Sequence, residues 1–203
     1  MLTLRSAPAS PFVRKVKIAA SELGLMSRIR IVVANTLDPE DALRSDNPLG
    51  KIPVLVIEDG TSIYDSRIIV DYLDMLAGGG RLTPPGLLQF PVKVRHALAD
   101  GLMDAALLLV YEKRFRADEQ QRSQSWTDHQ TGKVVRSLAA LEAACGPLQL
   151  PVNAGDIAVA CALGYLDFRF EGAWRANHPK LVSWLDQFAA AVPSFDLTRP
   201  PPA

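Results

Sequence analysis

Residues 47–55, with the sequence NPLGKIPVL, decide the fold, because a proline stands at the start of an apolar, strand-like run. Proline cannot donate a hydrogen bond to a neighbouring strand, so it belongs at a sheet edge or marks a cis peptide bond. A cis Ile52–Pro53 bond would turn the backbone N–H and C=O of Ile52 out of the sheet, where an added peptide could pair with them. The alternative is a proline that merely opens the strand, next to a solvated Lys51. The stretch alone leaves both interpretations open.

Short strand and helix patterns alternate on either side of this stretch. β-branched and apolar runs predict strands, apolar residues three and four apart predict helices, and the pair Asp59-Gly60 predicts a tight turn. The order β-α-β-α-β-β-α follows. Its segments are a strand over 2–5, a helix over 11–24 with Gly24 as its cap, a strand over 29–33, a short helix or turn over 39–45, strands over 52–57 and 62–64, and a helix over 65–76.

The composition changes after residue 77, where three glycines at 78–80 and the sequence TPPG at 83–86 break the pattern. We predict a linker over 78–87. After it no strand is predicted, and helical patterns run over 87–115, from about 125 to 144, over 157–170 and from Pro179 to about Pro193. Asn153 and Asp156 suit a capping box, and the proline tail at 200–202 is predicted to be extended. The fold class is therefore α/β plus all-α.

The bulk composition argues against several classes of protein. The chain has 22 basic and 22 acidic residues, so it lacks the basic surface of a nucleic-acid binder, and no apolar run is long enough for a membrane span. The first residues do not form a signal-peptide pattern. Two cysteines make no disulfide framework, and three scattered histidines without a HExxH or CxxC motif make a metal site unexpected. We expect a cytoplasmic protein without nucleic-acid, membrane or metal partners.

The stretch SPFVR at residues 10–14 lies between a predicted strand and a predicted helix. Ser10 and Pro11 suit the cap and first position of that helix, and an ordinary cap would explain both. The same geometry also suits a site, because the free amides at a helix start favour an anion and promote ionisation of a thiol. A serine hydroxyl there would donate a hydrogen bond to a thiolate, although it cannot form a mixed disulfide.

Residues 64–67, YDSR, also precede an apolar helical run. An acidic cap at a helix start again needs no function to explain it. In the functional interpretation the Ser66 amide and hydroxyl receive a carboxylate, while Asp65 holds an ammonium group. Together they would bind the head group of an amino acid.

In this order and spacing, the segments resemble the glutathione transferase family, and the resemblance covers essentially the whole chain. SPFVR resembles the serine-type active-site turn, GKIPVL at 50–55 the cis-proline segment, and DSR at 65–67 the γ-glutamyl-binding turn. NAGDIA at 153–158 resembles the capping box of the helical domain, and HPKLVSWL at 178–185 its closing helix. Each motif is weak alone, and their shared order makes the evidence strong.

The resemblance implies a thioredoxin-like domain over 1–77 and an all-helical domain over 88–203. It implies glutathione as co-substrate, no metal, and a homodimer. Ser10 would be the catalytic residue, donating to the glutathione sulfur. Ile52 would pair its backbone with the cysteinyl part while cis-Pro53 keeps that geometry, and Lys51 would meet the glycyl carboxylate. The implied glutathione-binding residues are Phe12, Lys51, Ile52, Pro53, Asp65 and Ser66.

The expected function is transfer of glutathione thiolate to a small hydrophobic electrophile. Ser10 in place of a cysteine argues against thiol transfer through a mixed disulfide, and Gly50 stands where insect-type serine enzymes carry histidine. The alternatives are a non-catalytic interaction module and a glutathione-dependent isomerase or dehalogenase. A pocket for the electrophile is expected between the domains. Four aromatic residues would line it unless they are ordinary core residues: Phe12, Tyr111, Phe115 and Trp174.

Overall fold

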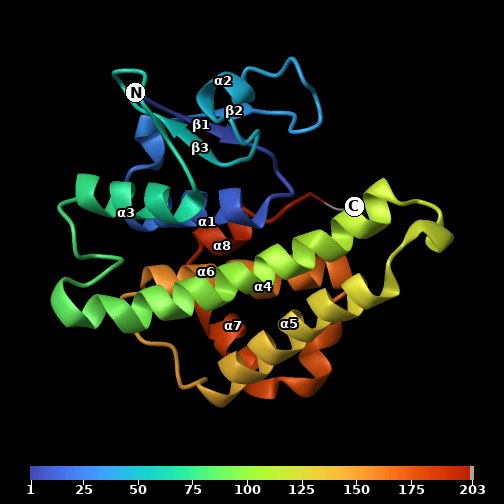
Figure 1. The fold of residues 1–203 in the computed structure, drawn as a ribbon. Coiled ribbons are helices and arrows are strands. Elements are labelled where there is room, and N and C mark those ends of the chain that lie inside the picture. The colour runs from blue at the N-terminus through green and yellow to red at the C-terminus, as the bar shows by residue number, and fades with distance from the viewer. Residues whose placement is uncertain (202–203) are drawn as a thin grey trace. The chain divides into compact units, whose positions relative to one another are not determined.

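A computed structural model describes residues 1–201 of the chain (Figure 1). The chain divides into two compact units. The first contains Met1–Val92 and the C-terminal segment from Val192, and the second contains Lys93–Ala191. The first unit holds a small mixed sheet with helices and the second is helical, which confirms the predicted fold class.

The sheet of the first unit has four strands in the order β2-β1-β3-β4. β1 runs parallel to β2 and antiparallel to β3, and β3 is antiparallel to β4. Along β1, alternate residues are buried, as expected for a strand with one face on the core. The strands are β1 (Leu2–Ser6), β2 (Ile29–Val33), β3 (Val54–Val56) and β4 (Ser62–Ile63).

Two long helices of the first unit, α1 (Pro11–Glu22) and α3 (Ser66–Leu76), lie side by side on one face of the sheet (Figure 1). The short α2 (Leu43–Asp46) packs against β3, and a 3-10 turn at Met26–Arg28 leads into β2. The core contains fully buried aliphatic side chains from both layers, among them Leu4, Val16, Leu55 and Leu73. This is the thioredoxin-like arrangement that the resemblance implied.

The observed elements differ from the predicted ones mainly at their ends. The strand predicted over 52–57 is shorter, because it begins only after Pro53, which has no N–H for a ladder. α1 ends at Glu22, and Gly24 follows with φ +73°, donating its N–H to Ser21 O at 2.9 Å. The predicted short helix at 39–45 is realised as α2 over 43–46.

The linker is attached to α3 by one carboxylate, that of Asp74, which is only 4% exposed. Its Oδ1 accepts from the backbone N–H groups of Arg81 and Leu82 at 3.0 Å each, and its Oδ2 accepts from Thr83 N at 3.1 Å. The Arg81 guanidinium in turn donates to the backbone oxygens of Glu22 and Leu23 at 3.0 and 3.3 Å. The linker therefore contacts the ends of both α1 and α3.

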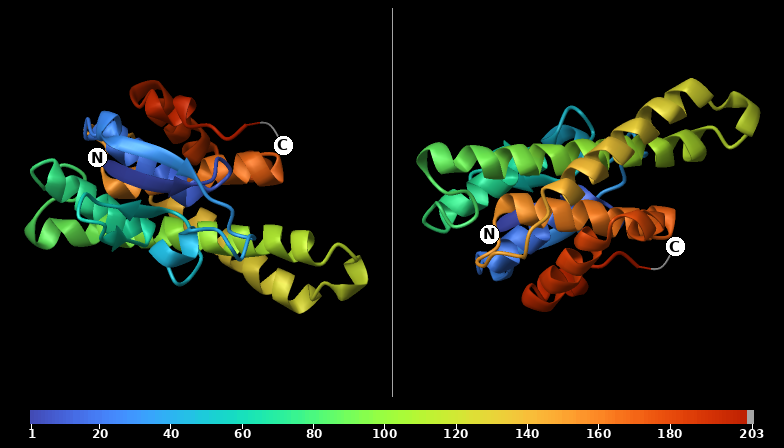
Figure 2. Two further views of the ribbon diagram at one scale, coloured as in Figure 1. Left: turned by 90° about the horizontal axis from the view of Figure 1, so that it is seen from above. Right: turned by 90° about the horizontal axis from the view of Figure 1, so that it is seen from below.

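The second unit consists of helices connected by loops. α4 (Gln89–Phe115), which belongs to this unit from Lys93 onward, forms a long hairpin with α5 (Gln124–Ala143) (Figure 2). α6 (Ala154–Phe170) is almost entirely buried up to Leu166, and Asn153 and Asp156 form its predicted capping box. After α6 the chain forms a 3-10 turn at Ala173–Asn177 and then α7 (Pro179–Ala191). Another 3-10 turn of this unit lies between α4 and α5, at Glu119–Gln121. In the first unit, a 3-10 turn at Gly86–Leu88 precedes α4. Within residues 1–201, no helix is long and apolar enough to cross a membrane.

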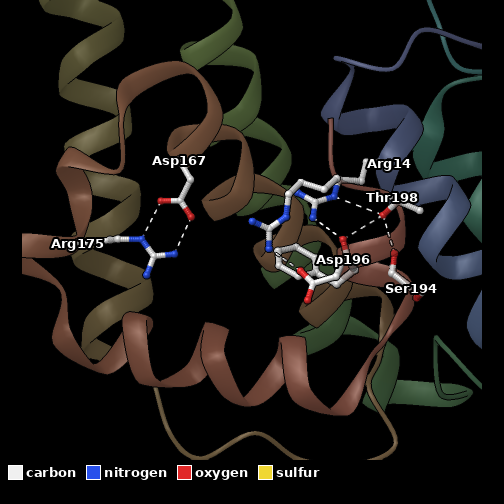
Figure 3. A network of polar contacts seen from close by, with 8 residues as sticks. Arg14, Asp167, Arg175, Ser194, Asp196 and Thr198 are labelled. Carbon is white, nitrogen blue, oxygen red and sulfur yellow. Dashed lines mark hydrogen bonds and ion pairs between the residues drawn. The ribbon is translucent and has the colours of Figure 1, made fainter. Parts of the chain in front are cut away.

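The C-terminal segment returns to the first unit, where α8 (Ser194–Leu197) packs against α1. Arg14 fixes this contact (Figure 3). Its guanidinium is nearly buried, donates to Phe195 O at 2.6 Å and to Thr198 Oγ1 at 3.4 Å, and lies 3.9 Å from the centre of the Phe195 ring. The sequence did not predict α8, and the predicted extended tail at 200–202 lies partly outside the described residues.

One buried polar side chain in the second unit is unpaired. Gln130 on α5 is 0% exposed, and within residues 1–201 neither its amide nitrogen nor its amide oxygen has a hydrogen-bond partner. An unpaired buried amide costs about 1–3 kcal/mol. Replacing Gln130 with methionine, which has a similar length and no amide, is therefore expected to raise the free energy of unfolding by about 1 kcal/mol. Urea denaturation measures this, and a destabilised variant would contradict it.

Candidate functional site

The sheet brings the three predicted site segments to one edge. Arg5 near the end of β1 pairs with Val54 at the start of the antiparallel β3, so the turn with Ser10 and the Ile52–Pro53 peptide leave the sheet on the same side. Ile63 at the end of β4 pairs with Leu55. The chain therefore reaches Asp65 at this same edge, next to the start of β3.

Ser10 is the N-cap of α1, and Pro11 is its first residue, as predicted. The Ser10 Oγ accepts a hydrogen bond from Val13 N at 3.3 Å. A hydroxyl has one donor and two acceptor positions, so this bond leaves its O–H available to donate. The side chain is half-buried and accessible from solvent. Capping and donation to a bound thiolate are thus compatible in one side chain.

The Ile52–Pro53 peptide bond is cis, as predicted. The Ile52 side chain packs against a small cluster formed by Ala34, Leu43 and Val54. Among residues 1–201, no hydrogen-bond partner reaches the backbone N–H or C=O of Ile52. Both groups are therefore open to an added peptide.

Asn47 organises the loop before this peptide, a role that the sequence did not reveal. It is 2% exposed; its Nδ2 donates to Lys51 O at 2.9 Å, and its Oδ1 accepts from Leu49 N at 3.0 Å. Gly50 adopts φ +60°, which favours glycine. The Lys51 side chain itself is exposed to solvent. The residue type gave some signal, because asparagine often bonds to the backbone two residues on.

Asp65 caps α3 and also pairs with the arginine two residues later. Its Oδ1 accepts from Arg67 N at 2.9 Å and its Oδ2 from Arg67 Nη2 at 3.0 Å. Burial acts to raise the pKa of Asp65, but the hydrogen bonds from Arg67 and the charges of Arg67 and Lys15 prevail and lower it. Ser66, the first residue of α3, is 3% exposed. The site therefore offers an ionised carboxylate beside the start of a helix.

Lys15 on α1 is a further charged residue near this site. It is 0% exposed, its Nζ lies 5.6 Å from the centre of the half-buried Phe12 ring, and its charge contributes to the lowered pKa of Asp65. Sequence reasoning missed it, because lysine is almost always exposed and the helical pattern assigned the buried face to apolar residues. The glutathione site predicted from the sequence thus has an additional buried cation.

The aromatic candidates for a second pocket fall into different environments. Trp174 is 6% exposed and donates its indole N–H to Asp167 Oδ1 at 2.8 Å, so it is a core residue of the second unit. Figure 3 shows Asp167 also bound by Arg175, at 2.9 and 2.7 Å. Tyr111 and Phe115 make an edge-to-face pair in an open pocket of about 400 Å³. The other residues that line this pocket are Leu108, Glu112, Arg116 and Trp126.

Comparison with protein families identifies both units. The N-terminal domain model of glutathione S-transferases matches residues 4–81, and the C-terminal domain model matches residues 124–187. Both Ser10 and the cis-proline peptide lie within the first match.

Whole-length relatives agree with these matches. The chain is 36% identical to the uncharacterized GST-like protein YibF of Escherichia coli strain K12, over 96% of each chain. It is 42% identical to a glutathione transferase family member from Pseudomonas fluorescens Pf-5 solved with bound glutathione, with a TM-score of 0.89 and coverage of 99% of this chain and 100% of that chain. A second structure, with bound S-(propanoic acid)-glutathione, gives 41% identity, the same coverage and a TM-score of 0.88. The chain therefore belongs to the glutathione S-transferase family.

Proposed function

We propose that this chain transfers glutathione to a small hydrophobic electrophile, through attack by the bound thiolate on an electrophilic carbon. The observation that carries the proposal is the convergence of Ser10, Ile52–Pro53 and Asp65–Ser66 at one edge of the sheet. A relative with 42% identity is described with glutathione bound, which supports the same ligand for this chain.

In this proposal Ser10 promotes ionisation of the glutathione thiol. A free thiol has a pKa of about 8.5, so only a few per cent is thiolate at neutral pH. Lowering that pKa by about two units requires roughly 2.7 kcal/mol of preferential stabilisation of the thiolate. The free amides at the start of α1 together with one hydroxyl donor supply an amount of this order.

The remaining groups would hold the peptide. The unpaired backbone of Ile52 would form two hydrogen bonds with the cysteinyl part, as an added strand does. Asp65 would hold the γ-glutamyl ammonium group, and the start of α3 at Ser66 its carboxylate. Lys51 would meet the glycyl carboxylate, and Phe12 would pack against the ligand. Each part of glutathione then has a partner of the matching chemistry.

The lowered pKa of Asp65 makes a prediction about pH. A carboxyl whose pKa is lowered loses its charge only when the pH falls through that lowered value. Asp65 therefore stays ionised at all pH values above its usual range, and we expect the dissociation constant of S-methylglutathione to stay constant between about pH 5 and pH 8. S-methylglutathione has no thiol to titrate, so calorimetry reports on the peptide groups alone. A marked loss of affinity between pH 7 and pH 5 would contradict this role for Asp65.

We also propose a homodimer and a cytoplasmic location. The dimer is supported by large apolar side chains that are exposed on the first unit, where a second copy would cover them. The cytoplasmic location is supported by the two free cysteines, Cys145 and Cys161, because free cysteines are usual in the reducing cytoplasm. The exposed residues are Ile68, Met75, Leu87, Leu88 and Phe90, with exposed fractions of 53%, 60%, 82%, 70% and 56%.

The test of function combines glutathione binding with turnover of a panel of electrophiles. Binding with turnover supports the transferase. Binding without turnover across the panel would instead indicate a non-catalytic interaction module. Absence of both heat and thermal shift on addition of glutathione would reject the proposal altogether.

A further inference from the structure

Every backbone and side-chain polar group of Asn47 forms a hydrogen bond within α2 or the loop that follows it. Its backbone N–H donates to Leu43 O at 2.7 Å, and its backbone C=O accepts from Gly50 N at 2.8 Å. Its Oδ1 accepts from Leu49 N at 3.0 Å, and its Nδ2 donates to Lys51 O at 2.9 Å. Asn47 is 2% exposed, so water competes little for these bonds.

The bond from Asn47 to Lys51 O acts on the peptide group that also contains the Ile52 N–H. A peptide group is planar, and in the trans form its C=O and N–H point in opposite directions. The Lys51–Ile52 peptide bond is trans. The Ile52 N–H therefore points away from the buried Asn47 amide, in a direction that the Asn47 bond fixes.

This bond is the one hydrogen bond that holds the Lys51–Ile52 peptide group among residues 1–201. Lys51 O accepts from Asn47 Nδ2 alone, and the Ile52 N–H has no partner there. On the other side of Ile52, Pro53 has no N–H that could hold the next peptide group. Removing the Asn47 amide would therefore leave this peptide group free to rotate.

α2 is itself fixed to the sheet close to this peptide group. Asp46, the last residue of α2, accepts from Arg5 Nε at 2.6 Å, and Arg5 is paired with Val54 at the start of β3. Leu43 of α2 belongs to the buried cluster against which the Ile52 side chain packs. The side chain of Ile52 and its peptide group are thus both held from α2.

We infer that Asn47 is a positioning residue for the cysteinyl part of glutathione, because its bond to Lys51 O aims the Ile52 N–H at the cysteinyl carbonyl. The inference rests on the proposed function, in which Ile52 pairs with the cysteinyl part, and it names the residue that prepares this pairing. A donor that already has its bound orientation loses less freedom on binding, which raises the affinity. Asn47 is buried and acts only through this peptide group.

The test is calorimetry on the full chain with two analogues of S-methylglutathione of matched shape. An ester replaces the Cys–Gly amide in the first and a trans alkene in the second, so both lack the glycyl N–H and only the ester keeps a carbonyl. We expect the unaltered chain to bind the ester about fivefold more tightly, since one hydrogen bond contributes a factor of this order. A variant that merely lowers the folded fraction weakens the binding of both analogues equally, so the ratio of the two affinities reports on positioning.

Two variants of Asn47 should abolish this preference for the ester. Asn47→Ala removes both side-chain hydrogen bonds. Asn47→Ser keeps an acceptor for the N–H two residues on, because serine forms the same kind of turn, but its hydroxyl is too short to reach Lys51 O. Asn47→Ser should therefore fold even if Asn47→Ala does not.

Asn35 provides a matched control in the same unit. Its Oδ1 accepts from Leu37 N at 3.0 Å, as the Asn47 Oδ1 does from Leu49 N, but it has no bond to the peptide group before Ile52. Asn35→Ala should therefore keep the preference of the unaltered chain. Loss of the preference in Asn47→Ser together with its retention in Asn35→Ala is the result that supports the inference.

Three results would overturn the inference while S-methylglutathione still binds and the proposed function stands. They are equal binding of the two analogues to the unaltered chain, an unchanged preference in Asn47→Ser, and an equal loss of preference in Asn35→Ala. If the unaltered chain does not bind S-methylglutathione at all, the proposed glutathione site is rejected, and the role of Asn47 is rejected with it.

Discussion

Replacing Ser10 with alanine is expected to lower kcat/KM for glutathione conjugation by about 10- to 100-fold. A hydrogen bond to a charged group contributes about 1.5–3 kcal/mol, and the variant removes this donor from the thiolate. Val13 N also loses its partner, the Ser10 Oγ at 3.3 Å, so a loss of about 1 kcal/mol in stability accompanies the change. The measurements are steady-state kinetics and the pH profile of kcat/KM, whose apparent thiol pKa should rise towards that of free glutathione.

The chain offers a matched control for this variant. Ser123 caps α5 as Ser10 caps α1, and its Oγ accepts from Trp126 N at the same distance of 3.3 Å. Ser123→Ala should therefore lose a similar amount of stability while its kinetics and pH profile stay unchanged. Ser10→Thr, which keeps a hydroxyl, should retain more activity than Ser10→Ala. If Ser10→Ala and Ser123→Ala have equal turnover, Ser10 is only a helix cap.

Local patterns predicted the parts of the site that depend on neighbouring residues. A serine or aspartate before an apolar helical run indicated the caps at Ser10 and Asp65. Pro53 at the start of a strand left a cis bond and a plain strand-opening proline both open, and only the resemblance to the family favoured the cis bond that the structure has. The strand at Ile29–Val33 follows from its β-branched residues. The caps and the strand need no information from distant parts of the chain, so local sequence is enough to predict them.

The features that the sequence did not predict depend on contacts between distant residues. The face of α1 that receives α8 contains Arg14, but its partners Phe195 and Thr198 lie more than 180 residues further along the chain. Lys15 is buried although its residue type favours exposure. Polar residues that pair over such distances look, in sequence, like ordinary surface residues.

Asp74 also looks like an ordinary surface residue in the sequence, although it is buried and its partners lie only seven to nine residues further on, and removing it should have the largest effect on stability. Asp74→Ala leaves three backbone N–H groups of residues 81–83 without an acceptor, and Leu82 among them is 3% exposed. Each unsatisfied buried donor costs about 1–3 kcal/mol, and the three losses overlap, so we expect the free energy of unfolding to fall by about 3–5 kcal/mol. Urea denaturation followed by circular dichroism measures this change.

Two further variants separate the lost hydrogen bonds from a general effect of charge. Asp74→Asn keeps one oxygen acceptor, so it should cost less than Asp74→Ala. Glu40→Ala removes an exposed acid from the same unit, and its effect on the free energy of unfolding should stay within about 0.5 kcal/mol.

Because Arg81 joins the linker to the end of α1, loss of Asp74 should also weaken the hydrogen bonds from Arg81 to the carbonyls of Glu22 and Leu23. Amide hydrogen exchange at the C-terminal turn of α1 should then be faster in Asp74→Ala than in the unaltered chain. If both the exchange rates and the free energy of unfolding stay unchanged, other contacts hold the linker.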